Sequence, residues 1–184
     1  MDDLKRNIVP LSCIKGYNIH IKNAKVVANS SADGCANSIF ASNGDIKAEN
    51  CYFESLVTGD VYLSYGGTFI NCEAYLSTAT HAYCFYLTSA AKPAVVIGGR
   101  YRAYTSNSAS GYVSAFIYAP SVESTAACAL YGVSCPTLAR SGYYQKNAIL
   151  TYGGYITSNG LITALAVSAS GNNTSIVGTI PLSK

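Results

Sequence analysis

The amino-acid sequence predicts an all-β protein in which short strands recur along the chain as successive coils of a solenoid. Composition supports β structure, because the 184 residues include 16 Tyr and 16 Gly but no Trp and one Met. Hydrophobic residues make up 49% and charged residues 11%, which indicates a folded domain and not a disordered polar tract. A recurring sequence pattern gives the order of the elements.

The pattern is an alternation of apolar residues, followed by Asn or Gly and then by a small residue or Cys. Its sixth positions are residues 24, 51, 72, 99, 132, 154 and 178, separated by 27, 21, 27, 33, 22 and 24 residues, about 26 on average. This spacing is typical of one coil of a solenoid. The seven copies are residues 19–24, 46–51, 67–72, 94–99, 127–132, 149–154 and 173–178.

A second strand-like segment lies between most copies, so each coil is expected to hold two or three short strands separated by turns. A single coil cannot bury its apolar side. Coils stacked about 4.8 Å apart pair every strand with its neighbours and enclose a common core. Asn side chains at the corners of such coils are expected to hydrogen-bond along the stack.

The seven cysteines cannot all pair within one chain, because their number is odd. No Cys-x-x-Cys spacing occurs, and the two histidines, His20 and His81, lie far from any paired thiols, so no metal site is expected. Cys51 and Cys72 occupy sixth positions of the pattern, where a small side chain fits a tight inward corner. We expect both to be buried thiols that pack as small hydrophobic residues.

The runs Asp45-Ile-Lys-Ala-Glu-Asn-Cys-Tyr-Phe53 and Gly67-Thr-Phe-Ile-Asn-Cys72 resemble the repeats of right-handed parallel β-helices of the pectin-lyase-like class. That class includes polysaccharide lyases, glycoside hydrolases and the tail spikes and fibres of bacteriophages. The resemblance covers residues 8–184 and is strongest up to residue 101. It implies a single domain over residues 1–184, with residues 1–13 as an N-terminal cap or linker. About seven rungs of right-handed helix would be roughly 34 Å long.

Two other architectures fit parts of the sequence. An up-and-down barrel or a sandwich is also rich in strands, but it does not repeat one six-residue signature at the length of a coil. The segment from Ser121 to Leu130 is rich in Ala, which favours a short helix and would make the fifth coil a decorated one.

Carboxylates are the groups through which an enzyme on this scaffold would cleave a polysaccharide by general acid and base catalysis. The candidates are Asp45 and Glu49 in one coil and Glu73 in the next. Glu49 shares the fourth pattern position with Lys22 of the preceding coil. The simpler interpretation is therefore a surface ion pair worth less than about 1 kcal/mol, and catalysis is not expected.

The fourth position of each copy is expected to point outward, because the first and third positions face the core. Along the stack it changes from charged to apolar residues, and an apolar stripe on an outer face implies a cover. We expect that cover to be other copies of the chain in a homotrimer, or a long loop of the fourth and fifth coils. A one-residue slip of register would exchange the two faces. The predicted interface residues are Ile70, Ile97, Leu130, Tyr152 and Val177.

Tyrosines gather in and around the longer connections, with arginines nearby. Aromatic rings with hydroxyl tips and guanidinium donors suit the binding of a glycan or a protein epitope. A purely structural interpretation has equal weight, because Tyr favours strands in a chain that lacks Trp. The predicted ligand-binding residues are Tyr101, Tyr104, Tyr112, Tyr143, Tyr144, Arg100 and Arg102.

The formal net charge of +3 is too small to indicate a nucleic-acid partner, and no apolar run reaches the about 18 residues of a membrane helix. The first residues lack the features of a secretion signal, so synthesis in the bacterial cytoplasm is expected. With the resemblance, these observations predict a structural and receptor-binding module of a phage or prophage tail fibre or spike. Such a module is carried on the virion and binds host-surface polysaccharide, a host protein or other virion proteins, without a cofactor. The alternatives are a polysaccharide lyase or glycoside hydrolase on the same fold, and a virion assembly protein that binds no ligand.

Overall fold

The computed structural model describes residues 8–10, 14–28, 38–42, 45–56, 59–88, 92–109, 111–120, 127–136, 142, 144–163, 165–169 and 174–179. Every regular element in these residues is a β-strand, and the named strands pair in parallel throughout. The prediction of an all-β chain is confirmed.

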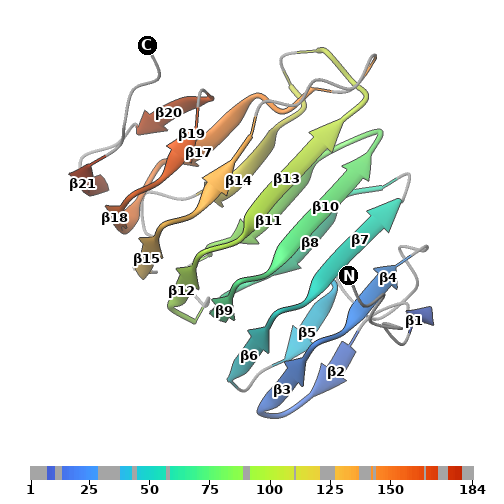
Figure 1. Ribbon diagram of the computed structural model, residues 1–184. Coiled ribbons are helices and arrows are strands. Elements are labelled where there is room, and N and C mark those ends of the chain that lie inside the picture. Colours follow the sequence, from blue (N-terminus) through green and yellow to red (C-terminus); the bar gives the residue numbers. More distant parts are fainter. Residues whose placement is uncertain are drawn as a thin grey trace.

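The chain returns to the same sheet at every third strand, which is the arrangement expected of a parallel β-helix. The first sheet contains β1 (Ile8–Pro10), β4 (Lys25–Ala28), β7 (Tyr52–Leu56), β10 (Glu73–Thr78), β13 (Arg100–Thr105), β16 (Ser134–Cys135) and β19 (Ile162–Thr163). The second contains β8 (Val61–Ser64), β11 (Ala82–Tyr86), β14 (Ser114–Ala119), β17 (Asn147–Thr151) and β20 (Ala166–Ala169), and the pair β2 (Ile14–Gly16) and β5 (Phe40–Ser42) precedes it. The third contains β3 (Ile19–Lys22), β6 (Ile46–Glu49), β9 (Gly67–Ile70), β12 (Ala94–Ile97), β15 (Ala127–Tyr131), β18 (Gly154–Asn159) and β21 (Thr174–Thr179). Figure 1 shows β4, β7, β10 and β13 of the first sheet side by side in chain order.

The third sheet tests the predicted repeat. Its first four copies lie in the predicted register, but the later copies do not. Cys128, and not Ala127, pairs with Ala94, so the fifth copy is displaced by one residue. The predicted sixth copy includes most of β17, which belongs to the second sheet, and β18 takes its place in the third. The seventh copy is displaced as well, because Ile176 pairs with Ile156.

The backbone at the fifth pattern position explains the displacement. All six corners there have φ between 50° and 86°, in the left-handed region that favours Gly and Asn. The prediction placed Tyr131 at this position, although Gly132 meets the requirement. The corner amides also bond along the stack: Asn50 N donates to Ile70 O at 2.9 Å and Asn71 N donates to Ile97 O at 2.7 Å. The corner residues are Asn23, Asn50, Asn71, Gly98, Gly132 and Gly160.

Aromatic rings fill much of the interior between the three sheets. The centroids of Phe69 and Phe85 lie 5.0 Å apart in an edge-to-face arrangement, and those of Tyr101 and Phe116 are also 5.0 Å apart. Such contacts add to the stabilisation from burial alone. The fully buried rings are Phe40, Phe53, Phe69, Phe85, Tyr101 and Phe116.

The five described cysteines are free thiols in the interior. Cys51 and Cys72 follow the corner residues Asn50 and Asn71 and are 3% and 0% exposed, which confirms that they pack as small buried residues. Contact with the Cys51 thiol, together with burial, raises the pKa of Cys72. Cys13 and Cys35 lie outside the described residues.

Two further expectations are corrected or limited by the fold. The helix expected over residues 121–130 is wrong for its last part, because β15 begins at Ala127, and residues 121–126 lie outside the described residues. Within the expected N-terminal cap or linker, β1 pairs with β4 as a strand of the first sheet, while residues 1–7 and 11–13 lie outside the description.

Candidate ligand-binding face

The outer side of the first sheet carries a mixed aromatic and charged surface, here called the first-sheet face. Parallel pairing aligns its side chains in two columns that run across successive strands. The first column is Lys25, Tyr52, Glu73 and Arg100, and the second is Val27, Glu54, Tyr75 and Arg102.

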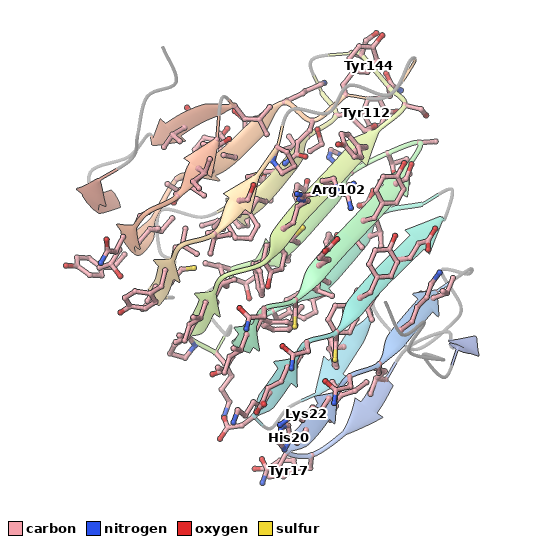
Figure 2. All side chains as sticks on the ribbon, viewed as in Figure 1. Tyr17, His20, Lys22, Arg102, Tyr112 and Tyr144 are labelled. Atoms are coloured by element: carbon pink, nitrogen blue, oxygen red, sulfur yellow. The ribbon has the colours of Figure 1, made fainter. Side chains whose placement is uncertain are left out.

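Arg102 lies at the centre of this face (Figure 2). Its Nη2 is 3.7 Å from Glu73 Oε2, and its guanidinium carbon is 5.4 Å from the centroid of the Tyr75 ring. The side chain is 17% exposed, and its buried Nε has no hydrogen-bond partner among the described residues. Arg100, next to it on β13, is exposed and forms no ion pair within the described part of the chain. Arg100 therefore presents donors that the described residues do not satisfy, whereas the Nε of Arg102 is enclosed by the protein.

The same combination of ring, cation and carboxylate recurs two strands earlier. Lys25 Nζ is 3.6 Å from Glu54 Oε2 and 5.3 Å from the centroid of the Tyr52 ring. Burial raises the pKa of the Tyr52 hydroxyl, and the charge of Glu54 adds to this effect. The hydroxyl therefore stays protonated near neutral pH and remains a hydrogen-bond donor.

Two tyrosines predicted to bind ligand do not lie on an open surface. Tyr101 is 0% exposed, because alternation along β13 turns it toward the core beside Phe85 and Phe116. Tyr104 points outward by the same alternation, but it is 2% exposed and packs on Tyr75 with ring centroids 5.6 Å apart. Neither ring offers a face to a ligand in this structure, so these two predictions are corrected.

The remaining predicted tyrosines belong to loops at the end of β13. Tyr144 is 45% exposed and forms an isolated antiparallel bridge with Thr105, the last residue of that strand. Tyr112 is half-buried, and Figure 2 shows it close to Tyr144 at the same end of the sheet. Tyr143 lies outside the described residues. The structure thus places Arg100 and Arg102 on the first-sheet face and Tyr112 and Tyr144 at its loop end.

The three candidate catalytic carboxylates are not brought together. Asp45 and Glu49 belong to the third-sheet side, whereas Glu73 lies on the first-sheet face. The Asp45 side chain is 86% exposed, with Lys92 Nζ at 3.5 Å. Each of the three has a cationic partner within 4 Å.

Glu49 is surrounded by two lysines and a histidine. Lys47 Nζ lies 2.6 Å, Lys22 Nζ 3.2 Å and His20 Nε2 3.1 Å from its carboxylate oxygens, which confirms the predicted proximity of Lys22. Bonds from Lys47 and then Lys22 lower its pKa from 4.5 to about 2. A general acid for glycoside cleavage needs the opposite shift, so this environment does not suit Glu49 to that task.

The predicted interface stripe is shorter than expected. Ile97 is 38% exposed and Ile70 half-buried on the outer side of the third sheet, but Leu130 is fully buried because of the one-residue displacement. Tyr131 takes the outward place at 46% exposed, and Asn159 follows it on β18. Tyr152 lies after β17 and packs edge-on against Tyr118 of the second sheet. Val177 lies on β21 opposite Thr157, and its side chain is outside the description.

A cluster of stacked tyrosines on the outer side of the second sheet was not predicted. Tyr62 and Tyr83 stack with centroids 5.4 Å apart, and Tyr83 and Tyr118 stack at 4.5 Å. Tyr83 lies on β11 and Tyr118 on β14. The alternation of these tyrosines with core residues along the same strands could have predicted that they share one outer face. The cluster comprises Tyr62, Tyr65, Tyr83, Tyr86 and Tyr118.

No group of three His, Cys, Asp or Glu side chains that could hold a metal ion occurs in the described part of the chain, and that part contains no helix long and apolar enough to cross a membrane. Compared with protein-family models, curated proteins and solved structures, the chain has no match. The first-sheet face is therefore interpreted from its own chemistry.

Proposed function

We propose that the chain is a non-catalytic attachment module that binds an extended surface glycan on the first-sheet face. The observation that carries this proposal is Arg102, whose guanidinium is held between Glu73 and Tyr75 beside the exposed Arg100. A guanidinium fixed in this way loses little conformational freedom on binding an oxygen-rich ligand.

The repeated geometry of the face favours a polymer over a small molecule. Ring and cation pairs recur on β4–β7 and on β10–β13, on strands spaced about 4.8 Å apart. Tyr52 and Tyr75 present aromatic surface beside these cations, and aromatic side chains with polar tips suit sugar rings. Many such weak contacts along a rigid sheet add up for a repeating chain.

The finer architecture belongs to the same proposal. We regard the three stacked sheets as a right-handed parallel β-helix of about seven rungs, of the pectin-lyase-like class and of the phage tail-fibre or tail-spike kind. The virion is then its location, and a homotrimer its assembled form. Ile70, Ile97 and Tyr131 are the apolar outward residues that support contact between copies. Light scattering that gives a monomer at micromolar concentration would remove the trimer from this proposal.

The experiment measures binding of the purified chain to a panel of bacterial surface polysaccharides by calorimetry. Arg102→Lys keeps the charge but removes the planar fork, and Arg100→Ala removes an exposed donor. We expect each to weaken binding about tenfold, the loss typical of a charged hydrogen bond. Lys22→Ala, on the third-sheet side, is the matched control and should bind as the wild type does.

Two results would overturn the proposal. If both arginine variants bind polysaccharide with the same affinity as the wild type, the glycan does not bind on the first-sheet face. New reducing or unsaturated ends, released by the wild type and abolished in Glu73→Gln, would favour the lyase or hydrolase alternative. If no polysaccharide of the panel binds, the alternative of a virion assembly protein without a ligand is favoured.

A further inference from the structure

His81 lies just before β11 of the second sheet, and its backbone forms hydrogen bonds to the segment around Asp60 that precedes it in the stack. Its backbone N donates to Asp60 Oδ1 at 3.2 Å, and its carbonyl accepts from Val61 N at 2.9 Å. On the opposite side, Ala82 N donates to the carbonyl of Val113 at 3.1 Å. The backbone of His81 is therefore fixed by the preceding strand, and Val113 is held against it.

The imidazole of His81 completes this attachment. Its Nδ1 accepts a hydrogen bond from Val113 N at 3.0 Å, in the place where a backbone carbonyl would accept within a sheet. The rings of Tyr83 and Tyr112 flank it, with centroids at 6.1 and 5.4 Å. Residues 106–113 form the loop that joins β13 to β14, and Val113 is its last residue. All of them except Ser110 are described.

A second side chain holds the same loop. Lys146 Nζ donates to the carbonyls of Ala109 and Tyr112 at 2.5 and 2.6 Å. Its backbone N donates to Ser114 Oγ at 2.9 Å, and that hydroxyl donates to Tyr144 O at 2.8 Å. The described residues of the loop are thus held by the side chains of Lys146 and His81.

We propose that His81 is a pH-sensitive latch, which holds Val113 and the adjoining Tyr112 against the start of β11 while its imidazole is neutral and releases them when the imidazole is protonated. Nδ1 accepts the Val113 bond only when it carries no proton. In the imidazolium both ring nitrogens are donors, so the bond is lost and two donors face each other. Histidine is the side chain that changes charge between about pH 5 and 8.

The charged and titratable neighbours favour two alternative arrangements. Asp60, on the preceding strand connection, attracts an imidazolium ring, whereas Lys146 repels it from the loop side. Burial raises the pKa of Tyr83 well above this pH range, so that ring stays uncharged. Protonation therefore turns the ring away from Val113 and toward Asp60. The loop that carries Tyr112 loses one of its two side-chain anchors.

The test is proton–nitrogen NMR of the full chain, with amide exchange and chemical shifts followed from about pH 8 to about pH 5. We expect Val113 to lose about fivefold in exchange protection, after correction for intrinsic rates, as the pH falls. His81→Gln supplies an amide oxygen that accepts at every pH, so its loop signals should not titrate. His20→Gln removes the other histidine of the chain and should titrate as the wild type does.

Asp60→Asn gives an independent arm, because it keeps an oxygen acceptor for the His81 amide but removes the charge that attracts the imidazolium. The midpoint of the loop transition should move to lower pH in this variant. A Val113 amide that is insensitive to pH in the wild type would overturn the proposal, as would a loop transition that persists in His81→Gln. If His81→Gln does not fold, wild-type ring-nitrogen shifts that show a protonated Nδ1 at pH 8 would overturn it equally.

Discussion

The corners of the third sheet differ between the early and the later turns of the chain. Asn23, Asn50 and Asn71 form the early corners, and glycines form the later ones, yet all share a left-handed backbone. The early corners add a side-chain contact, because Asn50 Nδ2 donates to Asn23 Oδ1 at 3.3 Å. The fold therefore requires a left-handed backbone conformation at each corner. The hydrogen bonds between asparagine side chains, here called the amide ladder, add to this requirement in the early turns.

The largest loss of stability is expected at a glycine whose surroundings leave no space for a side chain. A Cβ at Gly99, at φ +89°, would lie 2.0 Å from the carbonyl oxygen of Cys72. Gly99→Ala should therefore lower the free energy of unfolding by about 3 kcal/mol or more, because backbone must move. Gly132→Ala is the matched control, since φ is +60° and no atom lies within 4 Å of the added Cβ. It should cost about 1 to 2 kcal/mol from the backbone conformation alone.

Urea unfolding followed by circular dichroism measures both variants. Equal losses in Gly99→Ala and Gly132→Ala would show that the backbone conformation, and not the close approach to Cys72, excludes a side chain at Gly99.

A smaller effect separates the two contributions of an asparagine corner. Asn50→Ala removes the bond to Asn23 and also places Ala in the left-handed region, so a loss of about 1 to 2 kcal/mol is expected. Asn50→Gly keeps the conformation and removes only the bond, so it should lose about 1 kcal/mol or less. The same urea experiment compares them. If Asn50→Gly is as unstable as Asn50→Ala, the amide ladder dominates and the comparison above is reversed.

The corners also explain how far the sequence analysis reached. The early copies were placed in the correct register because Asn and a small residue together mark two adjacent positions. In the fifth copy, Gly132 was predicted to be the small residue at the sixth position of the pattern. In the structure it is the fifth residue, the one with a left-handed backbone conformation. Because few Tyr residues adopt that backbone, Tyr131 was a usable signal that the register needed a shift. Leu130 then turns inward and Tyr131 outward, as the structure shows.

The candidate site was harder to predict than the repeat. Arg100 and Arg102 alternate along β13, so their outward placement follows from the strand once its start at Arg100 is known. Tyr101 occupies the column of Phe53 and Ala74, which marks it as a core residue. The cover over Tyr104 depends on packing between segments far apart in the sequence, which periodicity does not report.

The smallest expected effect concerns the outer face of the third sheet, which is charged in the early turns and apolar later. The pKa of Glu49 is lowered to about 2 in the folded chain, because Lys47, Lys22 and His20 bond to its carboxylate. A lowered folded-state pKa contributes stability above the ordinary value of 4.5 and loses it as the pH falls from about 4.5 to about 2.

Glu49→Gln removes this contribution, so its free energy of unfolding should fall less steeply with acid than that of the wild type. Urea unfolding at low ionic strength, at several pH values between about 5.5 and 2.5, measures the two slopes. The other carboxylates act equally in both proteins, and the difference between the slopes therefore reports Glu49 alone. Added salt should shrink that difference, because the lysines at 2.6 and 3.2 Å are about half exposed to solvent. Identical slopes would show that the ion pairs of Glu49 do not stabilise the early turns.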